Sequence, residues 1–139
     1  LLYEAAEILG DEFLLNKVRT LSLKIADVAT EGLEADGSMV YEKDRKHTDK
    51  ERHWWVQAEA VVGFMYAYKN TKDIRYKEKA ARLWQYIQNR IVDTGQGEWI
   101  WSRNEDGATN HTDDKAGFWK CPYHNSRMCM EMIEHFNLK

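Results

Sequence analysis

The chain has 139 residues and a formal net charge of −3 at pH 7, with 31% charged and 12% aromatic residues. Its lysines and arginines are interspersed with acids and form no basic patch, which argues against a nucleic-acid partner, and no apolar run approaches the roughly 20 residues that span a bilayer. The length and the aromatic content indicate a globular domain, or a piece of one, with a real core.

The beginning of the chain predicts two helices. Residues 1–10 read as the second half of a helix that ends at a glycine, so we expect the chain to be a fragment of a longer protein. Asp11 can cap a second helix, which runs to about Glu31 and stops at Gly32. The apolar stripe of this second helix consists of Phe13, Leu14, Val18, Leu21, Ile25 and Val28.

A loop over residues 32–51 leads to a helix of a different kind. The loop contains a short strand-like segment, 38–41, and the run 42–52 is almost wholly charged, which predicts a solvated loop. The next helix, over about 53–69, has almost no polar face and is therefore expected to be surrounded by protein. Glu59 interrupts its apolar surface, and a buried glutamate needs a partner or a function.

The second half of the chain predicts two more helices. Residues 98–102 alternate like a short strand between them, and a polar loop over 108–116 follows. Enclosed and one-faced helices thus alternate along the chain, which favours two concentric helical layers. The helix over about 73–92 has an apolar side of Ile74, Ala81, Trp84, Ile87 and Ile91, and the last helix carries Met128, Met132, Ile133 and Phe136 at helical spacing.

The segment 118–127, Phe-Trp-Lys-Cys-Pro-Tyr-His-Asn-Ser-Arg, places a histidine at the start of the last helix. Histidine exchanges its proton near neutral pH, which makes His124 a candidate acid/base; the alternative is a histidine that satisfies local backbone groups. Cys121 and Cys129 are too few for a disulfide framework, and nothing near them has zinc-ligand spacing. We expect free thiols in a reducing cytoplasm and no metal site.

Two motifs carry a family resemblance. His-Trp-Trp-Val-Gln-Ala-Glu-Ala at 53–60 and the segment 118–127 resemble the N-acylglucosamine 2-epimerase superfamily, and within it the cellobiose 2-epimerases. The resemblance extends through the opening Leu-Leu-Tyr-Glu-Ala-Ala-Glu and the Gly-Glu-Trp at 97–99, and so covers essentially the whole chain. It implies an all-α fold, the C-terminal part of an (α/α)6 barrel, in which residues 1–139 form about five helices with short strand-like segments in the loops.

The resemblance also implies a cofactor-free reaction. The sugar ring opens, a base removes the C2 proton, a cis-enediolate forms, and a second acid returns a proton to the opposite face. Inversion at one carbon therefore needs two acid/base groups with suitable pKa values. His124 matches one of the family's two histidines. The other, in a Gly-His-Asp-Ile-Glu-like segment, and the family's N-terminal substrate residues are absent here, so this chain alone is expected to be inactive.

The remaining site residues follow from the same resemblance. Trp119 matches a tryptophan that stacks on the sugar, with a core tryptophan as the alternative. One of Trp54 and Trp55 faces the substrate and the other packs, because helix neighbours point about 100° apart; we expect Trp54 to face the substrate. Glu59 either orients a histidine, binds a hydroxyl, or is a carboxylate held by an arginine. Arg127 holds sugar oxygens or keeps the catalytic histidine neutral.

Three functions stay open at this stage. The favoured one is a 2-epimerase that acts on the reducing-end glucose of a β-linked disaccharide. The alternatives are a non-catalytic carbohydrate-binding barrel and an N-acylglucosamine- or mannose-specific isomerase of the same superfamily. We expect His124 and Trp119 to share one cleft. We also expect apolar barrel edges that favour self-association, formed by Leu1, Leu2 and Ile8 on one side and Met128, Met132 and Phe136 on the other.

Overall fold

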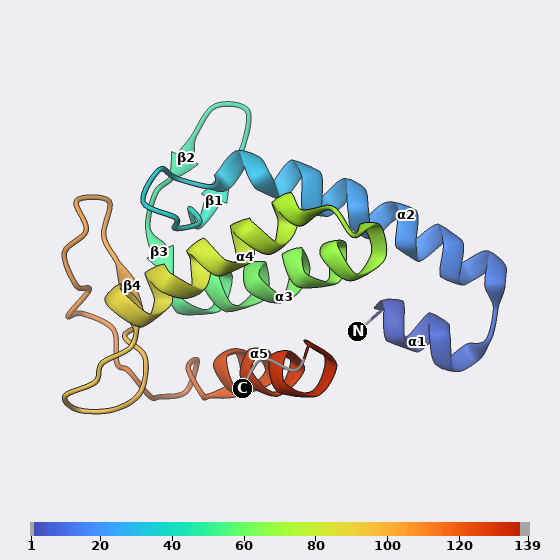
Figure 1. The fold of residues 1–139 in the computed structure, drawn as a ribbon. Coiled ribbons are helices and arrows are strands. Elements are labelled where there is room, and N and C mark those ends of the chain that lie inside the picture. Colours follow the sequence, from blue (N-terminus) through green and yellow to red (C-terminus); the bar gives the residue numbers. More distant parts are fainter. Residues whose placement is uncertain (1, 137–139) are drawn as a thin grey trace.

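The computed structural model describes residues 2–136, and α3 lies at their centre (Figure 1). Helices α2, α4 and α5 each pack against α3, and α1 packs against α2. The short strands gather at the end where α3 begins. In chain order the elements are α1 (Leu2–Leu9), α2 (Glu12–Ala29), η1 (Thr30–Gly32), β1 (Glu42–Lys43), β2 (Thr48–Asp49), β3 (Arg52–His53), α3 (Trp54–Thr71), α4 (Ile74–Tyr86), the π-helical turn η2 (Ile87–Ile91), β4 (Ser102–Arg103) and α5 (Tyr123–Phe136).

Helix α3 is enclosed, as its apolar sequence predicts. Its one fully buried amide, Gln57, is satisfied by a loop: its Oε1 accepts from the Met39 N–H at 2.8 Å, and its Nε2 donates to the Met39 carbonyl at 2.7 Å. These two bonds hold the segment before β1 against the start of α3. The buried residues of α3 are Trp54, Gln57, Ala58, Val61, Val62, Phe64, Met65 and Ala67.

Helix α2 begins as predicted, with the Asp11 side chain accepting from the Leu14 N–H at 2.9 Å. Much of its apolar stripe is exposed, however: Phe13 is 79% and Ile25 70% exposed, whereas Leu14 and Val18 are half-buried. Among the described residues of α2 only Ala26 is buried, although the helix packs against α3. The sequence pattern shows that an apolar face exists, but not that a neighbour within these residues covers it.

The two predicted barrel edges have different outcomes. Leu2 and Ile8 are exposed, as expected, and Leu1 lies outside the described residues. The expectation for the other edge was wrong for Met128 and Met132, which are buried in the core with α3 and α4, because α5 packs on α3 through this face. Partly buried Phe136 packs against the same core.

The predicted apolar side of the helix over 73–92 is confirmed at Ile87 and Ile91, which are fully buried, but it is wrong in the part that forms α4. Ile74 is 53% exposed and Trp84 36% exposed, whereas Leu83 is fully buried. The observed inner row of Tyr76, Ala80, Leu83 and Ile87 has the same helical spacing as the predicted one, so periodicity alone could not choose between them. The prediction was also wrong for Ile133 of the last helix, which is 59% exposed.

The charged run 42–52 is more ordered than a solvated loop. Strands β1 and β2 form a two-residue antiparallel hairpin, and β3 pairs with β4. Arg52 of β3 is buried, and its guanidinium donates to the carbonyls of Asn104 at 3.3 Å and Glu105 at 2.9 Å. The predicted strand over 38–41 is an isolated bridge between Met39 and Leu33.

Candidate functional site

His124 lies in the first turn of α5, against the first turns of α3. Its Nδ1 is 2.8 Å from Oε1 of Glu59 on α3, and both side chains are about two-thirds buried. An ionised carboxylate only accepts hydrogen bonds, so Nδ1 carries the proton of the neutral ring and donates to Glu59. The other ring nitrogen, Nε2, is left as the acceptor. This arrangement sets one tautomer and one orientation of the imidazole, as a base in a proton transfer requires.

Arg127 holds the other oxygen of the same glutamate. Its Nη2 donates to Oε2 of Glu59, and its Nη1 donates to Oε1 of Glu131 at 3.4 Å. His124 and Arg127 lie three residues apart on α5, and each contacts one oxygen of the Glu59 carboxylate on α3. Glu59 therefore contacts both the histidine and the arginine that the sequence alternatives named, while its role in orienting His124 stays a prediction.

Aromatic rings border this group. The ring of Trp55 lies 5.8 Å from that of His124, and the ring of Tyr41 meets Trp55 edge-on at 6.1 Å. A cavity of about 570 Å³ between α2 and α3 is lined by Tyr41, Trp55, Glu59 and Arg127 among others, and His124 adjoins it through Trp55 and Glu59 without being one of its lining residues. The sequence analysis did not identify Tyr41 as a site residue. The feature that could have identified it is its position as an aromatic residue between an apolar segment and a charged run.

The two adjacent tryptophans differ in burial. Trp54 is only 4% exposed, and its ring packs 4.7 Å from that of Trp101. Trp55 is half-buried and lines the cavity. Trp54, which was expected to face the substrate, is therefore the tryptophan that packs, because Trp101 and Lys120 cover its ring, whereas Trp55 stays partly open; a substrate contact of either ring stays a prediction.

Trp119 is not brought to the group around His124. It is 82% exposed, and the ring contact described for it is with Phe118, edge-on at 5.0 Å. It is absent from the residues that line the cavity. A cleft shared by Trp119 and His124 stays a prediction.

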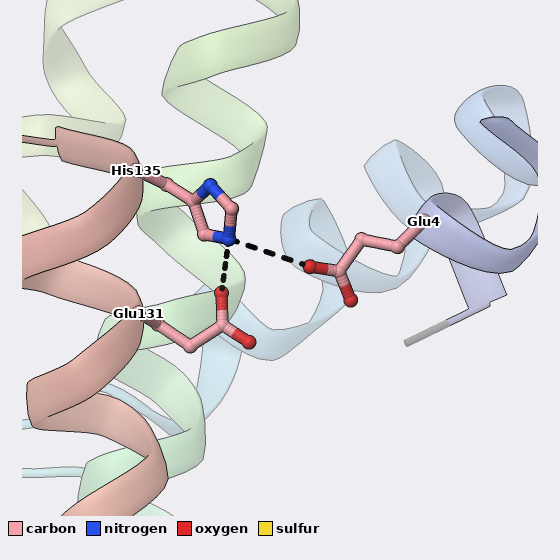
Figure 2. Close-up of side chains that lie close together, drawn as sticks. All are labelled: Glu4, Glu131 and His135. Carbon is pink, nitrogen blue, oxygen red and sulfur yellow. Dashed lines mark ion pairs between the residues drawn. The ribbon is translucent and has the colours of Figure 1, made fainter. Parts of the chain in front are cut away.

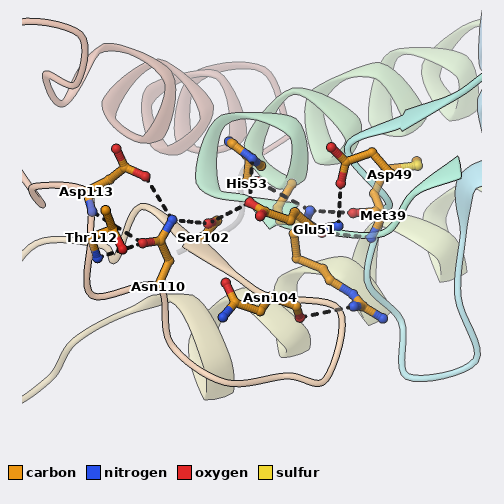
Figure 3. A network of polar contacts seen from close by, with 11 residues as sticks. Met39, Asp49, Glu51, His53, Ser102, Asn104, Asn110, Thr112 and Asp113 are labelled. Carbon is orange, nitrogen blue, oxygen red and sulfur yellow. Dashed lines mark hydrogen bonds and ion pairs between the residues drawn. The ribbon is translucent and has the colours of Figure 1, made fainter.

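A polar network continues the site along the strands (Figure 3). His53 Nε2 lies 3.0 Å from Oε2 of Glu51, and Ser102 Oγ donates to that same oxygen at 3.2 Å. Asn110 Nδ2 donates to Ser102 Oγ at 3.0 Å. Burial lowers the pKa of His53, and the ring of Tyr41 lies 4.2 Å from the His53 ring at a tilt of 32°. The network therefore connects the loop after β4 to Tyr41, which together with Trp55 forms the aromatic wall of the cavity.

A second cluster lies beyond Arg127, between α1 and α5 (Figure 2). Nε2 of His135 is 3.7 Å from a carboxylate oxygen of Glu4 and 3.7 Å from one of Glu131. The three ligand atoms lie within 4.8 Å of one another, as in a cation site. The Tyr66 hydroxyl lies 2.9 Å from Glu4 and 2.7 Å from Glu131, and burial raises the pKa of this phenol. We describe the group as an ion-pair cluster that joins the first and last helices.

The expectation of free thiols was confirmed for Cys121 and Cys129, which are both exposed. None of the described helices is long and apolar enough to cross a membrane.

Comparisons with known proteins agree on one family. The family described as N-acylglucosamine 2-epimerase (GlcNAc 2-epimerase) matches residues 2–127. Cellobiose 2-epimerase of Bacteroides fragilis is 47% identical over 135 residues, which cover 96% of this chain and 34% of that protein. Cellobiose 2-epimerase of Ruminococcus albus is 42% identical with the same coverage. This chain therefore spans about a third of the length of these curated relatives.

Solved structures show the same fold. A sugar epimerase from a ruminal bacterium superposes with a TM-score of 0.89 at 40% identity, over 95% of this chain and 34% of that one. A cellobiose 2-epimerase from Bacillus thermoamylovorans gives a TM-score of 0.81 at 38% identity, over 94% of this chain and 33% of that one. The predicted fold class is confirmed: the chain is mostly helical and corresponds to about a third of an (α/α)6 barrel.

Proposed function

Because this chain belongs to the N-acylglucosamine 2-epimerase family, we propose that it is the C-terminal third of a sugar 2-epimerase whose acid/base residue is His124. The single observation that carries the proposal is the contact of His124 Nδ1 with Glu59 at 2.8 Å. A histidine that merely satisfied local backbone groups would not need a carboxylate from another helix. The pairing leaves Nε2 with a free lone pair, which a proton acceptor needs.

The proposed reaction begins with opening of the sugar ring to the aldehyde. His124 Nε2 then takes the proton from C2, or gives a proton to C2, on one face of the open-chain sugar. When the C2–H bond breaks, its electron pair forms the C1=C2 bond of a cis-enediolate, and the negative charge moves to O1. Delivery of a proton to the opposite face of C2 completes the inversion. No redox change occurs, so the proposed reaction needs no cofactor.

We propose supporting roles for the neighbours of His124. Glu59 holds the imidazole tautomer, and it becomes the counter-ion when the ring is protonated. Arg127 neutralises Glu59 between turnovers; its predicted direct contact with sugar oxygens stays part of the proposal. The second acid/base group and the remaining substrate contacts come from the part of the protein outside this chain.

The substrate we propose is the reducing-end glucose of a β-linked disaccharide such as cellobiose. This proposal rests on two relatives that carry the name cellobiose 2-epimerase at 47% and 42% identity, whereas a relative named D-mannose isomerase is 30% identical over 98 residues. The aromatic wall of Tyr41 and Trp55 suits the apolar C–H faces of sugar rings. We place the protein in the cytoplasm, where its free thiols would remain reduced.

The direct test is incubation of the full-length protein with cellobiose in deuterated water. We expect the disaccharide epimerised at C2, with deuterium incorporated at that carbon. Parallel incubations with N-acetylglucosamine and mannose test the related isomerases. Tight sugar binding without deuterium incorporation from any of the three sugars would contradict the enzyme and favour a carbohydrate-binding barrel.

The 139-residue chain alone is expected to give no epimerised product, because it supplies only one of the two proton-transfer groups. We also propose that it self-associates through the exposed apolar residues of α1 and α2, such as Ile8 at 86% and Phe13 at 79% exposure. Sugar analysis and light scattering measure the two expectations. Epimerised product would contradict the proposal that the chain holds only one of the two proton-transfer groups. A chain that stays monomeric at high concentration would contradict the proposed self-association.

Trp55→Ala in the full-length protein is expected to raise KM for cellobiose about tenfold, or about 1.4 kcal/mol of binding free energy, with kcat little changed. The half-buried ring lines the cavity and moves no proton, so its loss affects binding. Steady-state kinetics measure the effect. Trp84→Ala is the matched control, since Trp84 is partly exposed on α4 and lies outside that cavity. Equal KM values for the two variants would contradict the role of Trp55.

A further inference from the structure

Lys120, four residues before His124, is a cation with almost no access to solvent. Its side chain is 1% exposed. The ammonium donates to Oε1 of Glu98 at 3.1 Å and to the carbonyls of Trp99 at 2.7 Å and Lys115 at 2.6 Å. These three acceptors use all three N–H bonds of a lysine. A buried charge is tolerated only when it is paired and hydrogen-bonded in this way.

Glu98 connects Lys120 to the helix that carries His124. The same Oε1 that accepts from Lys120 also accepts from Asn125 Nδ2 at 3.0 Å. Lys120 precedes α5, Asn125 is in its first turn, and His124 lies between them in sequence. One carboxylate oxygen therefore joins the approach to α5 with the first turn of the helix.

The backbone at Glu98 is itself held in an unfavourable conformation. Its φ is +61°, in the left-handed region that side chains with a Cβ adopt at a cost. Burial raises the pKa of Glu98, but the hydrogen bond from the Trp99 N–H and the Lys120 ammonium lower it more, so the carboxyl is ionised at neutral pH. The strained residue is thus kept in place by the partners of its side chain.

Lys120 also contacts Trp54, whose ring lies next to the imidazole of His124. Its Nζ lies 5.1 Å from the centroid of the Trp54 ring, within cation–π distance. The Trp54 ring in turn meets the His124 ring edge-on at 6.4 Å. Trp54 therefore lies in contact with the buried cation and with the imidazole, which explains why it is covered and Trp55 is open.

We propose that the buried Lys120–Glu98 ion pair is a positioning device for His124, which holds the first turn of α5 in the orientation where Nδ1 meets Glu59 and Nε2 is free. This inference rests on the proposed function for its kinetic consequence. Apolar residues at both positions would fill the same space without the cost of burying two charges. The pair therefore supplies orientation of the imidazole, by fixing both the start of α5 and the ring of Trp54.

The test uses the full-length protein with Lys120→Met and, separately, Glu98→Gln. We expect kcat for cellobiose epimerisation to fall about 100-fold, the size of effect that a misplacement of about 1 Å produces, with KM changed less than about threefold. Nitrogen-15 NMR of the histidine side chains, with His124 assigned from a His124→Gln sample, should show loss of the Nδ1–H tautomer that donates to Glu59. Lys77→Met is the matched control, because exposed Lys77 lies 5.8 Å over the ring of Tyr68, away from the site.

The double variant Lys120→Met/Glu98→Leu separates positioning from folding. Replacing both charges by apolar side chains should restore the melting temperature that a single unpaired charge lowers. A restored melting temperature with a low kcat and an altered His124 signal supports the proposal, also where a single variant fails to fold. Recovery of kcat together with the melting temperature, or an unchanged His124 signal, overturns it. A wild-type protein that shows the Glu59-bonded tautomer but epimerises no sugar would refute the proposed function and leave the positioning intact.

Discussion

His124→Ala in the full-length protein is expected to lower kcat for C2 epimerisation by between about 10²- and 10⁴-fold, the range of a lost acid/base group. Deuterium exchange at C2 should fall by the same factor, because His124 Nε2 is the proposed site of that proton transfer. Sugar binding should change little, since a proton-transfer group acts mainly in the transition state. Rapid-quench kinetics in deuterated water and calorimetry with cellobiose measure the two quantities.

The matched control is His111→Ala, because His111 is exposed in the loop between β4 and α5. It should leave both kcat and exchange near the wild-type values. A His124→Ala enzyme that turned over cellobiose at more than about a tenth of the wild-type rate would contradict the acid/base role. Equal loss of kcat and of sugar affinity would instead point to a binding role for the imidazole.

Gln57→Leu is expected to lower the free energy of unfolding by roughly 2 to 4 kcal/mol, because it leaves two buried backbone groups without partners at about 1 to 3 kcal/mol each. Gln57 is 0% exposed and bonds both the N–H and the carbonyl of Met39. Leucine fills a similar volume, so the change removes hydrogen bonds with little cavity. Denaturant-induced unfolding of the full-length protein measures the difference.

The same change should also affect the aromatic wall, since Tyr41 follows Met39 by two residues. We expect a raised KM for cellobiose alongside the lower stability. Gln85→Leu, at an exposed position of α4, is the control and should shift stability by less than about 0.5 kcal/mol. Equal unfolding midpoints for the two variants would show that water replaces the hydrogen bonds of Gln57 to Met39, and would contradict their predicted contribution to stability.

Local signals in the sequence predicted much of the fold. Asp11 caps α2 as expected, because a side-chain acceptor before a helix satisfies a free N–H wherever the helix packs. The apolar run of α3 predicted its enclosure, since a helix without a polar face cannot face water. His124 was found by its place at the start of an amphipathic helix, and the family resemblance supplied the chemistry.

Other features depended on contacts between distant segments. The α4 face that packs is set by its neighbours, so Leu83 is buried while Trp84 is partly exposed, although both fit a helical period. Which of Trp54 and Trp55 is buried depended on Trp101 and Lys120, which come from other segments.

The sequence by itself thus determined the helical class, the family and the acid/base candidate, because these depend on periodicity and on motifs read along the chain. Only the tertiary structure decided which side chain contacts the His124 ring, since Glu59 lies 65 residues away and any of several polar residues could have met the ring. It also decided that Lys120 is a buried cation. A lysine in a loop is ordinarily solvated, and it is buried here because three acceptors converge on it. Desolvation is a property of the assembled neighbours, and no single segment encodes it.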